Sequence, residues 1–332
     1  MQTGAPSRRV TLKDVAKAAG VSVASASYAL NGTGSVGDQT REYILDVAGR
    51  LGYRPNQAAK AMKTGRTGAI GLVVPDLTNP FFPSLAQVII QTARQHGYSV
   101  FLTDTEGSPD QERQSISLLA DRGVDGLIWF PIADTDTVGA IAEGVPIVVL
   151  DRNLTEYDVV QADYAAGGEL AAAHLVAAGH RNIGVIAGPA AASSARQRAD
   201  AAVDYIKRHA ALAWCVNNAF SLDIEPAVVE ALESGGATAV FAGADLIAIG
   251  AIRHLQSKGV RVPQDVSVVG FDDIPWAQLN TPALTTIEMP VEEMAVEAVE
   301  ALLRRMAHLN EPRRRIVFNV SLVERETVRP AG

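Results

Sequence analysis

Two acidic side chains stand directly after apolar runs that are typical of buried strands. Asp151, followed by Arg152, comes after Pro146–Leu150, and Asp272 comes after Ser267–Phe271. In parallel sheets ligands bind at the carboxyl ends of the strands, where a carboxylate could accept hydrogen bonds from two hydroxyls. These positions therefore predict a site for a small hydroxylated molecule such as a polyol. The alternative is a structural role in a helix cap or an ion pair between lobes.

The residue patterns needed for catalysis or metal binding are missing. No Gly-x-Gly-x-x-Gly follows a predicted strand, and neither a phosphate loop ending in Gly-Lys-Ser/Thr nor a His-Glu-x-x-His occurs. The six histidines are scattered, and the single cysteine, Cys215, excludes an internal disulfide and a multi-cysteine metal site. We expect neither an enzyme nor a protein that holds a metal or another cofactor.

Charge is divided unequally along the chain. The formal net charge is −8, yet residues 1–66 hold ten Lys and Arg against four Asp and Glu, which gives +6 there and −14 in the remainder. A basic first segment indicates a polyanionic partner, and the alternative is a solvated helical surface.

Helix signals favour the polyanionic partner. Thr11 with Asp14 resembles a capping box, Gly20 offers a C-terminal stop, and Ser22 can cap a second helix after a short turn. A third helix is predicted from about Asp38 to Leu51. Two short helices joined by a tight turn and backed by a third are typical of a helix-turn-helix DNA reader.

Composition and length bound the rest of the chain. The 332 residues suggest two or three domains, and 48% hydrophobic with 20% charged residues is typical of a globular protein. No stretch approaches the ~20 apolar residues of a membrane helix, and the N-terminus lacks the apolar core of a secretory signal. We therefore expect a cytoplasmic protein with no membrane partner.

From residue 69 onward, β-rich runs alternate with helical stretches, which predicts parallel sheets with helices on both faces. The predicted strands are Ala69–Val74, Ser99–Thr103, Gly126–Trp129, Pro146–Leu150, Ile183–Ala187, Ala239–Ala242 and Ser267–Phe271. The predicted helices are Leu85–His96, Gln111–Asp121, Gly168–Ala178, Gln197–His209 and Leu246–Lys258.

Several segments together resemble the lactose-repressor (LacI/GalR) family of bacterial transcriptional regulators along almost the whole chain. They are Thr11–Ser22, Leu30-Asn31, Thr40-Arg41, Leu51-Gly52-Tyr53-Arg54-Pro55-Asn56, Gly65-Arg66-Thr67, Ile70–Phe82 and Val320–Arg325. The resemblance implies an N-terminal all-α helix-turn-helix headpiece followed by an α/β periplasmic-binding-protein-like core of two parallel-sheet subdomains.

The resemblance also implies the domain boundaries. The headpiece would span residues 1–53, a hinge helix and linker 54–66, and an effector-binding and dimerisation core 67–332. Within the core, one subdomain would take about 67–163 and 291–318, and the other about 164–290 and 319–332. The effector cleft would lie between them.

DNA contacts follow from the same resemblance. The second helix would enter the major groove, with Val23, Ala24 and Tyr28 over base edges. Val23 and Ala24 can read only thymine methyls or shape, because neither side chain forms hydrogen bonds. The alternative for Tyr28 is a ring lying on the headpiece core. The other expected DNA-contacting residues are Thr11, Ser22, Ser27 and Asn31, with Asn56, Ala59, Met62 and Lys63 of the hinge.

The hinge segment would order on DNA and pair with its dimer mate. The resemblance gives Met62 the role of the apolar wedge that is usually Leu, and a thioether side chain can still unstack a base step in the minor groove. Ala59 is small enough for two hinge helices to approach closely.

Effector contacts are carried over in the same way. Ser194-Ala195-Arg196-Gln197-Arg198 resembles the family's Ser-x-Arg-x-Arg segment, in which the second Arg, here Arg198, reaches the effector. Asp272 matches the family's sugar-binding aspartate. The aromatic residues expected to stack on a ligand, with plain core as the alternative for each, are Phe81, Phe82, Phe220 and Trp129.

Two departures leave the effector class open. Ala244-Asp245 lacks the Asn that usually precedes this aspartate in sugar-responsive members, and Met289 stands where Gln is frequent. Both changes remove hydrogen-bonding groups. A sugar is the first expectation, and a nucleoside or purine is the alternative.

The sequence therefore predicts a DNA-binding regulator, in the first instance a repressor, that reads a near-palindromic double-stranded operator. One recognition helix with small side chains gives little specificity, so we expect a homodimer. The resemblance implies that tetrameric members use an extra C-terminal helix, and because residues 324–332 show no pattern of one, we expect a dimer rather than a tetramer. DNA binding would associate the protein with the nucleoid. A transport-type solute-binding protein is the less favoured alternative, because it has no use for a basic headpiece.

Overall fold

The computed structural model describes residues 10–54 and 65–331, which form two compact units divided between Thr67 and Gly68. The hinge residues Asn56, Ala59, Met62 and Lys63 lie outside the described residues. Each unit has its own hydrophobic core.

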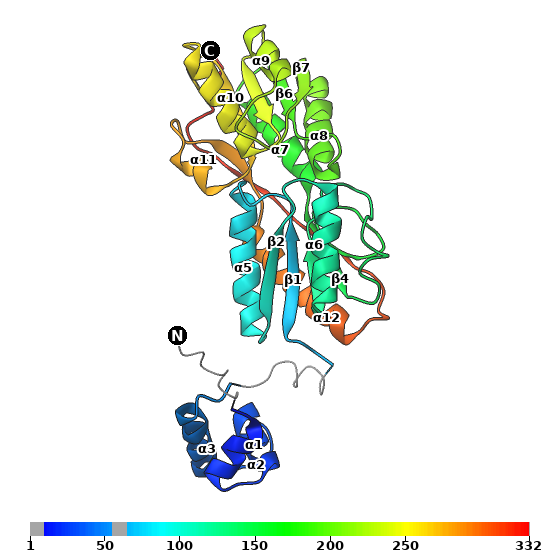
Figure 1. Cartoon of the computed structure of the whole chain (residues 1–332). Helices are drawn as coiled ribbons and strands as arrows, with labels where there is room; N and C mark the ends of the chain where they lie inside the picture. Colours follow the sequence, from blue (N-terminus) through cyan, green and yellow to red (C-terminus); the bar gives the residue numbers. More distant parts are fainter. Residues whose placement is uncertain (1–9, 55–64, 332) are drawn as a thin grey trace, which may run out of the picture. The chain divides into compact units, whose positions relative to one another are not determined.

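The first unit is a three-helix domain, with α1 (Leu12–Ala19), α2 (Val23–Asn31) and α3 (Asp38–Arg50) (Figure 1). The predicted capping box is confirmed: the Thr11 amide donates to the Asp14 carboxylate at 2.8 Å, and the Asp14 amide donates back to the Thr11 hydroxyl at 3.4 Å. Gly20 ends α1 with a φ of 66°, a left-handed conformation that glycine adopts without strain.

A small apolar core holds these helices together. Its buried residues are Val15, Ala16, Ala19, Ala26, Ala29, Ile44, Val47 and Ala48. Because alanine predominates among the buried residues of α1 and α2, the two helices can pack closely, while α2 leaves Val23, Ala24 and Tyr28 to solvent.

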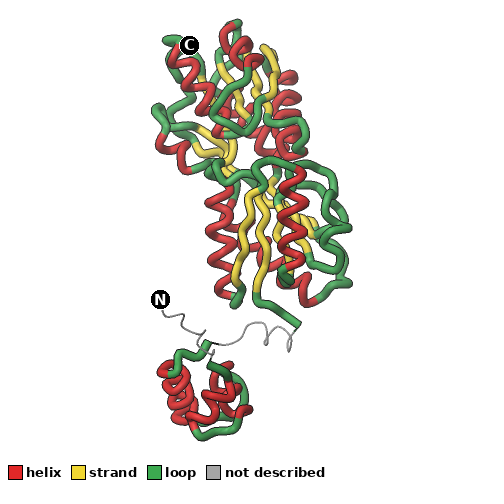
Figure 2. The backbone as a smooth tube through the Cα atoms, in the orientation of Figure 1, coloured by secondary structure: helices red, strands yellow, loops and turns green. Residues whose placement is uncertain are grey.

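The second unit contains two six-stranded sheets (Figure 2). The first sheet has the order β11-β5-β4-β3-β1-β2, and every adjacent pair is parallel. Its strands are β1 (Ala69–Val74), β2 (Ser99–Asp104), β3 (Gly126–Trp129), β4 (Ile147–Leu150), β5 (Asp158–Ala162) and β11 (Arg315–Phe318). Helices α5 (Phe81–Gln95) and α12 (Val291–Ala307) cover one face, and α6 (Pro109–Asp121) covers the other. We call this body the first lobe.

The second sheet has the order β12-β10-β9-β8-β6-β7 and is parallel except for the antiparallel pair β10–β12. Its strands are β6 (Asn182–Ala187), β7 (Ala211–Asn217), β8 (Ala239–Ala242), β9 (Ser267–Asp272), β10 (Thr285–Glu288) and β12 (Ser321–Val323). Its helices are α7 (Tyr164–Ala177), α8 (Ser193–His209), α9 (Pro226–Glu233), α10 (Asp245–Ser257) and α11 (Pro275–Leu279). We call this body the second lobe.

The chain passes between the lobes three times, after β5, after β10 and after β11. This architecture confirms the expected fold class, a helix-turn-helix headpiece followed by an α/β core of two mostly parallel sheets. Each predicted strand is present to within one residue at either end, whereas β5, β7, β10, β11 and β12 were not predicted.

Within the described residues, no helix is long and apolar enough to cross a membrane. The same residues contain no group of three or more His, Cys, Asp or Glu side chains arranged to hold a metal ion.

Candidate functional site

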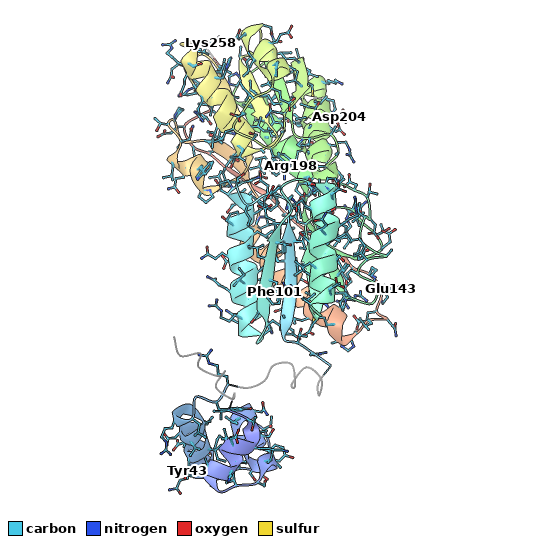
Figure 3. The ribbon with its side chains drawn as sticks, viewed as in Figure 1. Tyr43, Phe101, Glu143, Arg198, Asp204 and Lys258 are labelled. Atoms are coloured by element: carbon cyan, nitrogen blue, oxygen red, sulfur yellow. The ribbon has the colours of Figure 1, made fainter. Side chains whose placement is uncertain are left out.

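A buried ion pair lies at the carboxyl edge of the second sheet. Asp272 ends β9 and Arg198 lies on α8, and the Arg198 Nη1 donates to Asp272 Oδ1 at 2.8 Å and to the Gly243 carbonyl at 2.9 Å. The guanidinium carbon lies 3.9 Å from the ring centroid of Phe271 and 4.9 Å from that of Tyr164. Figure 3 places Arg198 where the two lobes meet. Sequence reasoning had named Asp272 and Arg198, and the structure brings them together.

Burial raises the pKa of two acidic groups, the Asp272 carboxyl and the neighbouring Tyr164 phenol. It raises the pKa of Asp272 to about 6, against the opposing charge of Arg198. It also raises the pKa of the Tyr164 phenol to about 12, so this group is neutral at physiological pH. A ligand that hydrogen-bonds the Asp272 carboxylate would relieve part of its desolvation.

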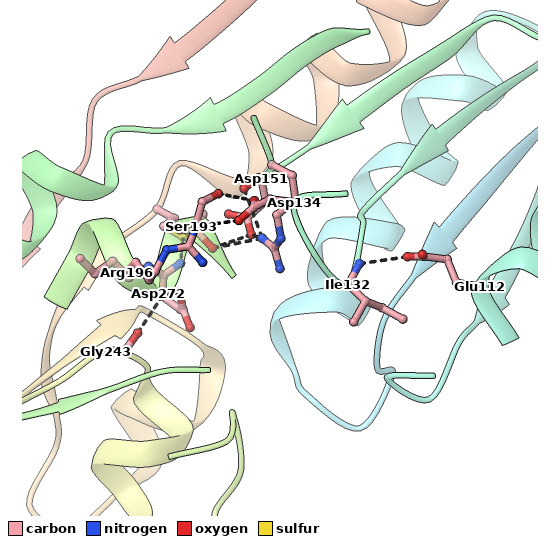
Figure 4. Close-up of polar contacts among 12 residues, drawn as sticks. Glu112, Ile132, Asp134, Asp151, Ser193, Arg196, Gly243 and Asp272 are labelled. Carbon is pink, nitrogen blue, oxygen red and sulfur yellow. Dashed lines mark hydrogen bonds and ion pairs between the residues drawn. The ribbon is translucent and has the colours of Figure 1, made fainter. Parts of the chain in front are cut away.

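A second charged pair belongs to the first lobe and contacts the second. Asp151, directly after β4, forms an ion pair with Arg152, and both are buried. The Ser194 hydroxyl, on α8 of the second lobe, donates to Asp151 Oδ2 at 2.9 Å and lies 3.1 Å from Arg152 Nη1 (Figure 4). Ser194, Asp151 and Arg152 therefore join the lobes, which was the structural alternative for Asp151.

Several polar atoms of these buried groups lack a hydrogen-bond partner among the described residues. They are Asp151 Oδ1, Arg152 Nε, Arg198 Nε and the Tyr164 hydroxyl. The backbone of Ala162 lies near that hydroxyl but outside hydrogen-bond geometry. Buried polar groups are rarely left unpaired, because each costs free energy until it finds a partner. Together they offer donors and acceptors to a small polar molecule.

Three phenylalanines form an apolar wall in the first lobe. Phe81 and Phe82, at the start of α5, pack edge-to-face with Phe130, and the ring centroids of Phe82 and Phe130 are 4.9 Å apart. The Arg152 guanidinium carbon lies 5.4 Å from the Phe130 centroid, so this wall adjoins the Asp151–Arg152 pair. Beside the other ion pair, the sulfur of Met289 lies 3.4 Å from Arg198 Nη2. Phe220 is half-buried in the second lobe.

Trp129 requires a correction. The structure places its ring in the core on the α6 face of the first sheet, fully buried and with its indole nitrogen donating to Glu112 at 3.1 Å. A ring so enclosed has no face to offer a ligand, and Trp129 is therefore not one of the proposed effector residues. Phe130, the next residue, points to the opposite face and is the aromatic side chain that adjoins Arg152.

Asp134 is a lobe contact that sequence reasoning missed. It receives hydrogen bonds from the Ser193 hydroxyl at 2.5 Å and from Arg196 Nη2 at 2.9 Å, both on the first turn of α8 (Figure 4). The loop that carries Asp134 is held by the buried Glu112, whose carboxylate accepts the Ile132 amide at 2.9 Å. Tyr164 was missed as well, because nothing in its neighbourhood matches a ligand-binding motif.

The headpiece presents its own candidate surface along α2. Val23 and Tyr28 are 43% and 48% exposed, and Ala24 and Asn31 are exposed beside them. Thr11 and Ser22 are exposed at the N-termini of their helices. Ser27 is half-buried, and its backbone carbonyl accepts a hydrogen bond from the side-chain Nδ2 of Asn31 at 2.8 Å.

Tyr28 packs against the loop that follows α2 rather than into the core. A side chain at Gly34 would lie 2.7 Å from the Tyr28 ring, so the absence of one makes room for the ring. The phenol nevertheless remains half exposed.

The Asp272 pKa predicts a pH dependence of stability. Because burial raises this pKa to about 6, the folded protein holds a proton that the unfolded chain, with an Asp pKa of about 3.9, releases earlier. The contribution of Asp272 to the free energy of unfolding is therefore fully present below about pH 4 and falls by up to about 3 kcal/mol as pH rises to about 6. The Asp272→Asn variant should not show this fall. Its free energy of unfolding, measured with urea, should therefore increase relative to that of the wild type as pH rises from about 4 to 7. Asp200→Asn, at an exposed position of α8, is the control, and parallel pH profiles for Asp272→Asn and wild type would contradict the assignment.

Comparison with known proteins bears on both units. Residues 11–56 match the family described as bacterial regulatory proteins, lacI family, and residues 172–328 match a periplasmic binding protein-like domain. The ribose operon repressor of Haemophilus influenzae is 34% identical, over 96% of this chain and 98% of its own. The transcriptional regulator DegA of Bacillus subtilis is 32% identical over 97% and 99%, and the repressor PurR of Edwardsiella ictaluri is 31% identical over 96% of each chain.

Solved structures show the same architecture. The lac repressor dimer bound to operator and the anti-inducer ONPF aligns with a TM-score of 0.87 and 29% identity, over 96% of this chain and 99% of that one. The complex of the regulator CelR with cellobiose aligns with a TM-score of 0.72 and 28% identity, over 96% and 100%. With a headpiece match, full-length relatives above 30% identity and the shared fold, the chain belongs to the LacI family of bacterial regulatory proteins.

Proposed function

We propose that this chain is a transcriptional repressor that binds a near-palindromic operator as a homodimer and responds to a small hydroxylated effector, in the first instance a sugar, held between its lobes. The relatives it matches are transcriptional regulators and repressors rather than enzymes. The observation that carries the effector proposal is the set of unpaired buried polar atoms around Arg152 and Arg198. The solute-transport alternative gains no support, because the headpiece matches a DNA-binding regulator family.

The proposed domain organisation keeps the boundaries expected from the sequence. The headpiece spans 1–53, the hinge 54–66 and the core 67–332, with subdomains of about 67–163 with 291–318 and about 164–290 with 319–332. The strand content of the two sheets supports this division.

A neutral, hydroxylated molecule suits the proposed site better than an anion. Each of the ion pairs Arg198–Asp272 and Arg152–Asp151 joins one positive and one negative side chain, so the site has little net charge. The atoms of these pairs without a hydrogen-bond partner among the described residues are two guanidinium N–H donors and one carboxylate oxygen, and the Tyr164 phenol is a fourth such group. Hydroxyl groups can satisfy all of these, since each hydroxyl both donates and accepts.

A purine or nucleoside remains the second candidate on a specific observation. Near Arg198 and Gly243, Ala244 offers only a methyl group and Met289 only a weak thioether acceptor, 3.4 Å from Arg198 Nη2, while the phenylalanine wall supplies apolar edges. The relatives include both ribose repressors and PurR proteins. Thermal-shift assays with D-ribose and with adenine separate the two candidates, because a ligand that binds only the folded protein raises its melting temperature.

The proposed DNA contacts lie on the half-buried Ser27 and on exposed headpiece residues, together with four residues of the hinge. The exposed residues are Thr11, Ser22, Val23, Ala24, Tyr28 and Asn31, and the hinge residues are Asn56, Ala59, Met62 and Lys63. The N-terminus of α2 carries the positive end of the helix dipole, and Ser22 caps it, so a backbone phosphate fits there. Val23, Ala24 and Tyr28 are then left to meet base edges.

Two substitutions test the proposed DNA contacts. Tyr28→Ala should weaken binding to the preferred operator more than binding to random DNA, because it removes a base contact. Lys63→Ala should weaken both about equally and make the salt dependence of binding less steep, because it removes a phosphate contact. Fluorescence anisotropy over a range of salt concentrations measures both effects, and equal responses of the two variants would argue against the assignments.

The proposed dimer uses the open edge of the first sheet. The edge strand β2 has no sheet partner beyond β1 among the described residues, and its Phe101 and Leu102 are 44% and 37% exposed (Figure 3). Exposed apolar edge strands favour association with a second chain. The opposite edge strand, β11, begins at Arg315, the last of three consecutive arginines, and such charges discourage association.

Phe101→Lys should convert the dimer into a monomer in sedimentation velocity at micromolar concentration, because it places a charge on the apolar edge. Val317→Lys on β11, where Val317 is 47% exposed, is the matched control and should remain dimeric. A Phe101→Lys protein that stays dimeric would place the interface elsewhere.

The proposed effector site is tested by separating DNA binding from its regulation. Asp272→Ala should retain operator affinity and lose the effect of the active ligand, because the loss of one charge-assisted hydrogen bond typically lowers affinity about ten- to a hundredfold. Operator binding is measured with and without the ligand that shifts the wild-type melting temperature. A wild-type response in the variant would exclude Asp272 from the site, and a loss of operator binding would assign it a structural role.

A further inference from the structure

The turn that carries Asp272 has an unfavourable backbone. Asp272 and Asp273 have φ values of 110° and 51°, and residues other than glycine rarely adopt positive φ values. Such residues persist only where the surrounding structure holds them. The position of the Asp272 carboxylate therefore depends on whatever fixes residues 272–274.

Asp245 fixes the end of this turn. It is the first residue of α10, has 0% exposure, and its Oδ2 accepts the Ile274 amide at 2.9 Å. Its Oδ1 lies 2.5 Å from the Thr286 hydroxyl on β10. Both carboxyl oxygens are thus engaged within the second lobe, and neither is accessible to a ligand.

Gly270 on β9 makes room for this carboxyl group. A Cβ at Gly270 would lie 2.2 Å from Asp245 Oδ1, so any side chain there would displace it. Gly243, two residues before α10 begins, is also engaged, because its carbonyl accepts a hydrogen bond from Arg198 at 2.9 Å. The short segment 243–245 therefore both accepts a hydrogen bond from Arg198, the partner of Asp272, and carries Asp245.

A second group holds the turn from its other side. Arg325 forms an ion pair with Asp273 at 2.7 Å and donates to the Leu284 carbonyl at 2.9 Å. This pair acts on Asp273, whereas the Ile274 amide is held by Asp245. Arg325 therefore cannot replace the bond that Asp245 makes.

We infer that Asp245 is a positioning residue for the effector site, holding Asp272 in place through the Ile274 amide without touching the ligand. The inference rests on the proposed role of Asp272. Burial, together with the neighbouring Asp272 and Asp273, raises the pKa of Asp245 well above its ordinary value. An amide at this position has nearly the shape of the carboxyl group: its oxygen can accept from the Ile274 amide, and its NH₂ can donate to the Thr286 hydroxyl, which in the native protein donates to Asp245 Oδ1.

Hydrogen exchange of the ligand-free full-length protein tests the positioning directly. In Asp245→Ala, amides of residues 272–280 should exchange at least about tenfold faster, because the turn loses its buried acceptor. In Asp245→Asn the exchange should stay within about twofold of wild type, since the bond from the Ile274 amide is kept and the bond with Thr286 can form again in the reverse direction. Residues 85–95 of α5 serve as a reference for global unfolding. Unchanged exchange of residues 272–280 in Asp245→Ala would overturn the inference.

Thr286→Val provides a second variant of nearly the same shape. Removing this hydroxyl leaves the Asp245 carboxyl held by one bond, so exchange of residues 272–280 should again rise, by a smaller factor, with the α5 reference unchanged. If Asp245→Ala also loses protection in α5, this variant decides: unchanged exchange of residues 272–280 overturns the inference.

Calorimetric titration with D-ribose and with adenine separates this inference from the proposed function. We expect Asp245→Ala to weaken the probe that binds the wild type by about tenfold or more and Asp245→Asn to restore it. Faster exchange with unchanged affinity would show that Asp245 holds the turn but that Asp272 is not an effector residue. If neither probe binds the wild type, the choice of effector is wrong, and the exchange data still decide the role of Asp245.

Discussion

The second lobe is organised around the buried ion pair of Arg198 and Asp272. Removing two charges from water is costly, and their attraction compensates only when further hydrogen bonds complete the geometry. Here the Gly243 carbonyl supplies one such bond and the rings of Phe271 and Tyr164 flank the guanidinium. The strained turn after β9, the entry to α10 and the helix α8 must all hold their places for this pair to form, so the carboxyl edge of the sheet is built around it.

Sequence patterns located this edge because its residues follow recognisable strands. Asp272 and Asp151 come directly after buried apolar runs, and Arg198 lies in a motif of the family. The prediction for Trp129 was wrong because it did not take into account which face of the strand each side chain occupies. Side chains alternate across a strand, so Trp129 shares its face with Leu127 and Val73, toward α6, while Phe130 shares the face of Ile128, toward α5. Applying this alternation to the end of β3 would have selected Phe130.

Other parts of the fold, and one contact of the site, could not be predicted from short sequence patterns. The strand β5 begins with Asp158, whose carboxylate is neutralised by Arg305, a residue 147 positions away, and no sequence window contains both. Strands β11 and β12 are four and three residues long, too short for a periodic pattern to be distinctive. Asp134 lies in a loop whose place is set by Glu112. These features depend on tertiary contacts, which is why periodicity and motifs did not reveal them.

Helix α8 carries both the contacts between the lobes and a residue of the proposed effector site. Ser193, Ser194 and Arg196 on its first turns bond to Asp134 and Asp151 of the first lobe, and Arg198, one residue pair further, bonds to Asp272 of the second. A ligand shifts an equilibrium only through a difference in its affinity for the two states. In the proposed mechanism, a molecule that engages both Arg198 Nε and Asp151 Oδ1 spans the same helix as the lobe contacts. Its affinity must then depend on how the lobes are closed, and that dependence is the coupling that regulation requires.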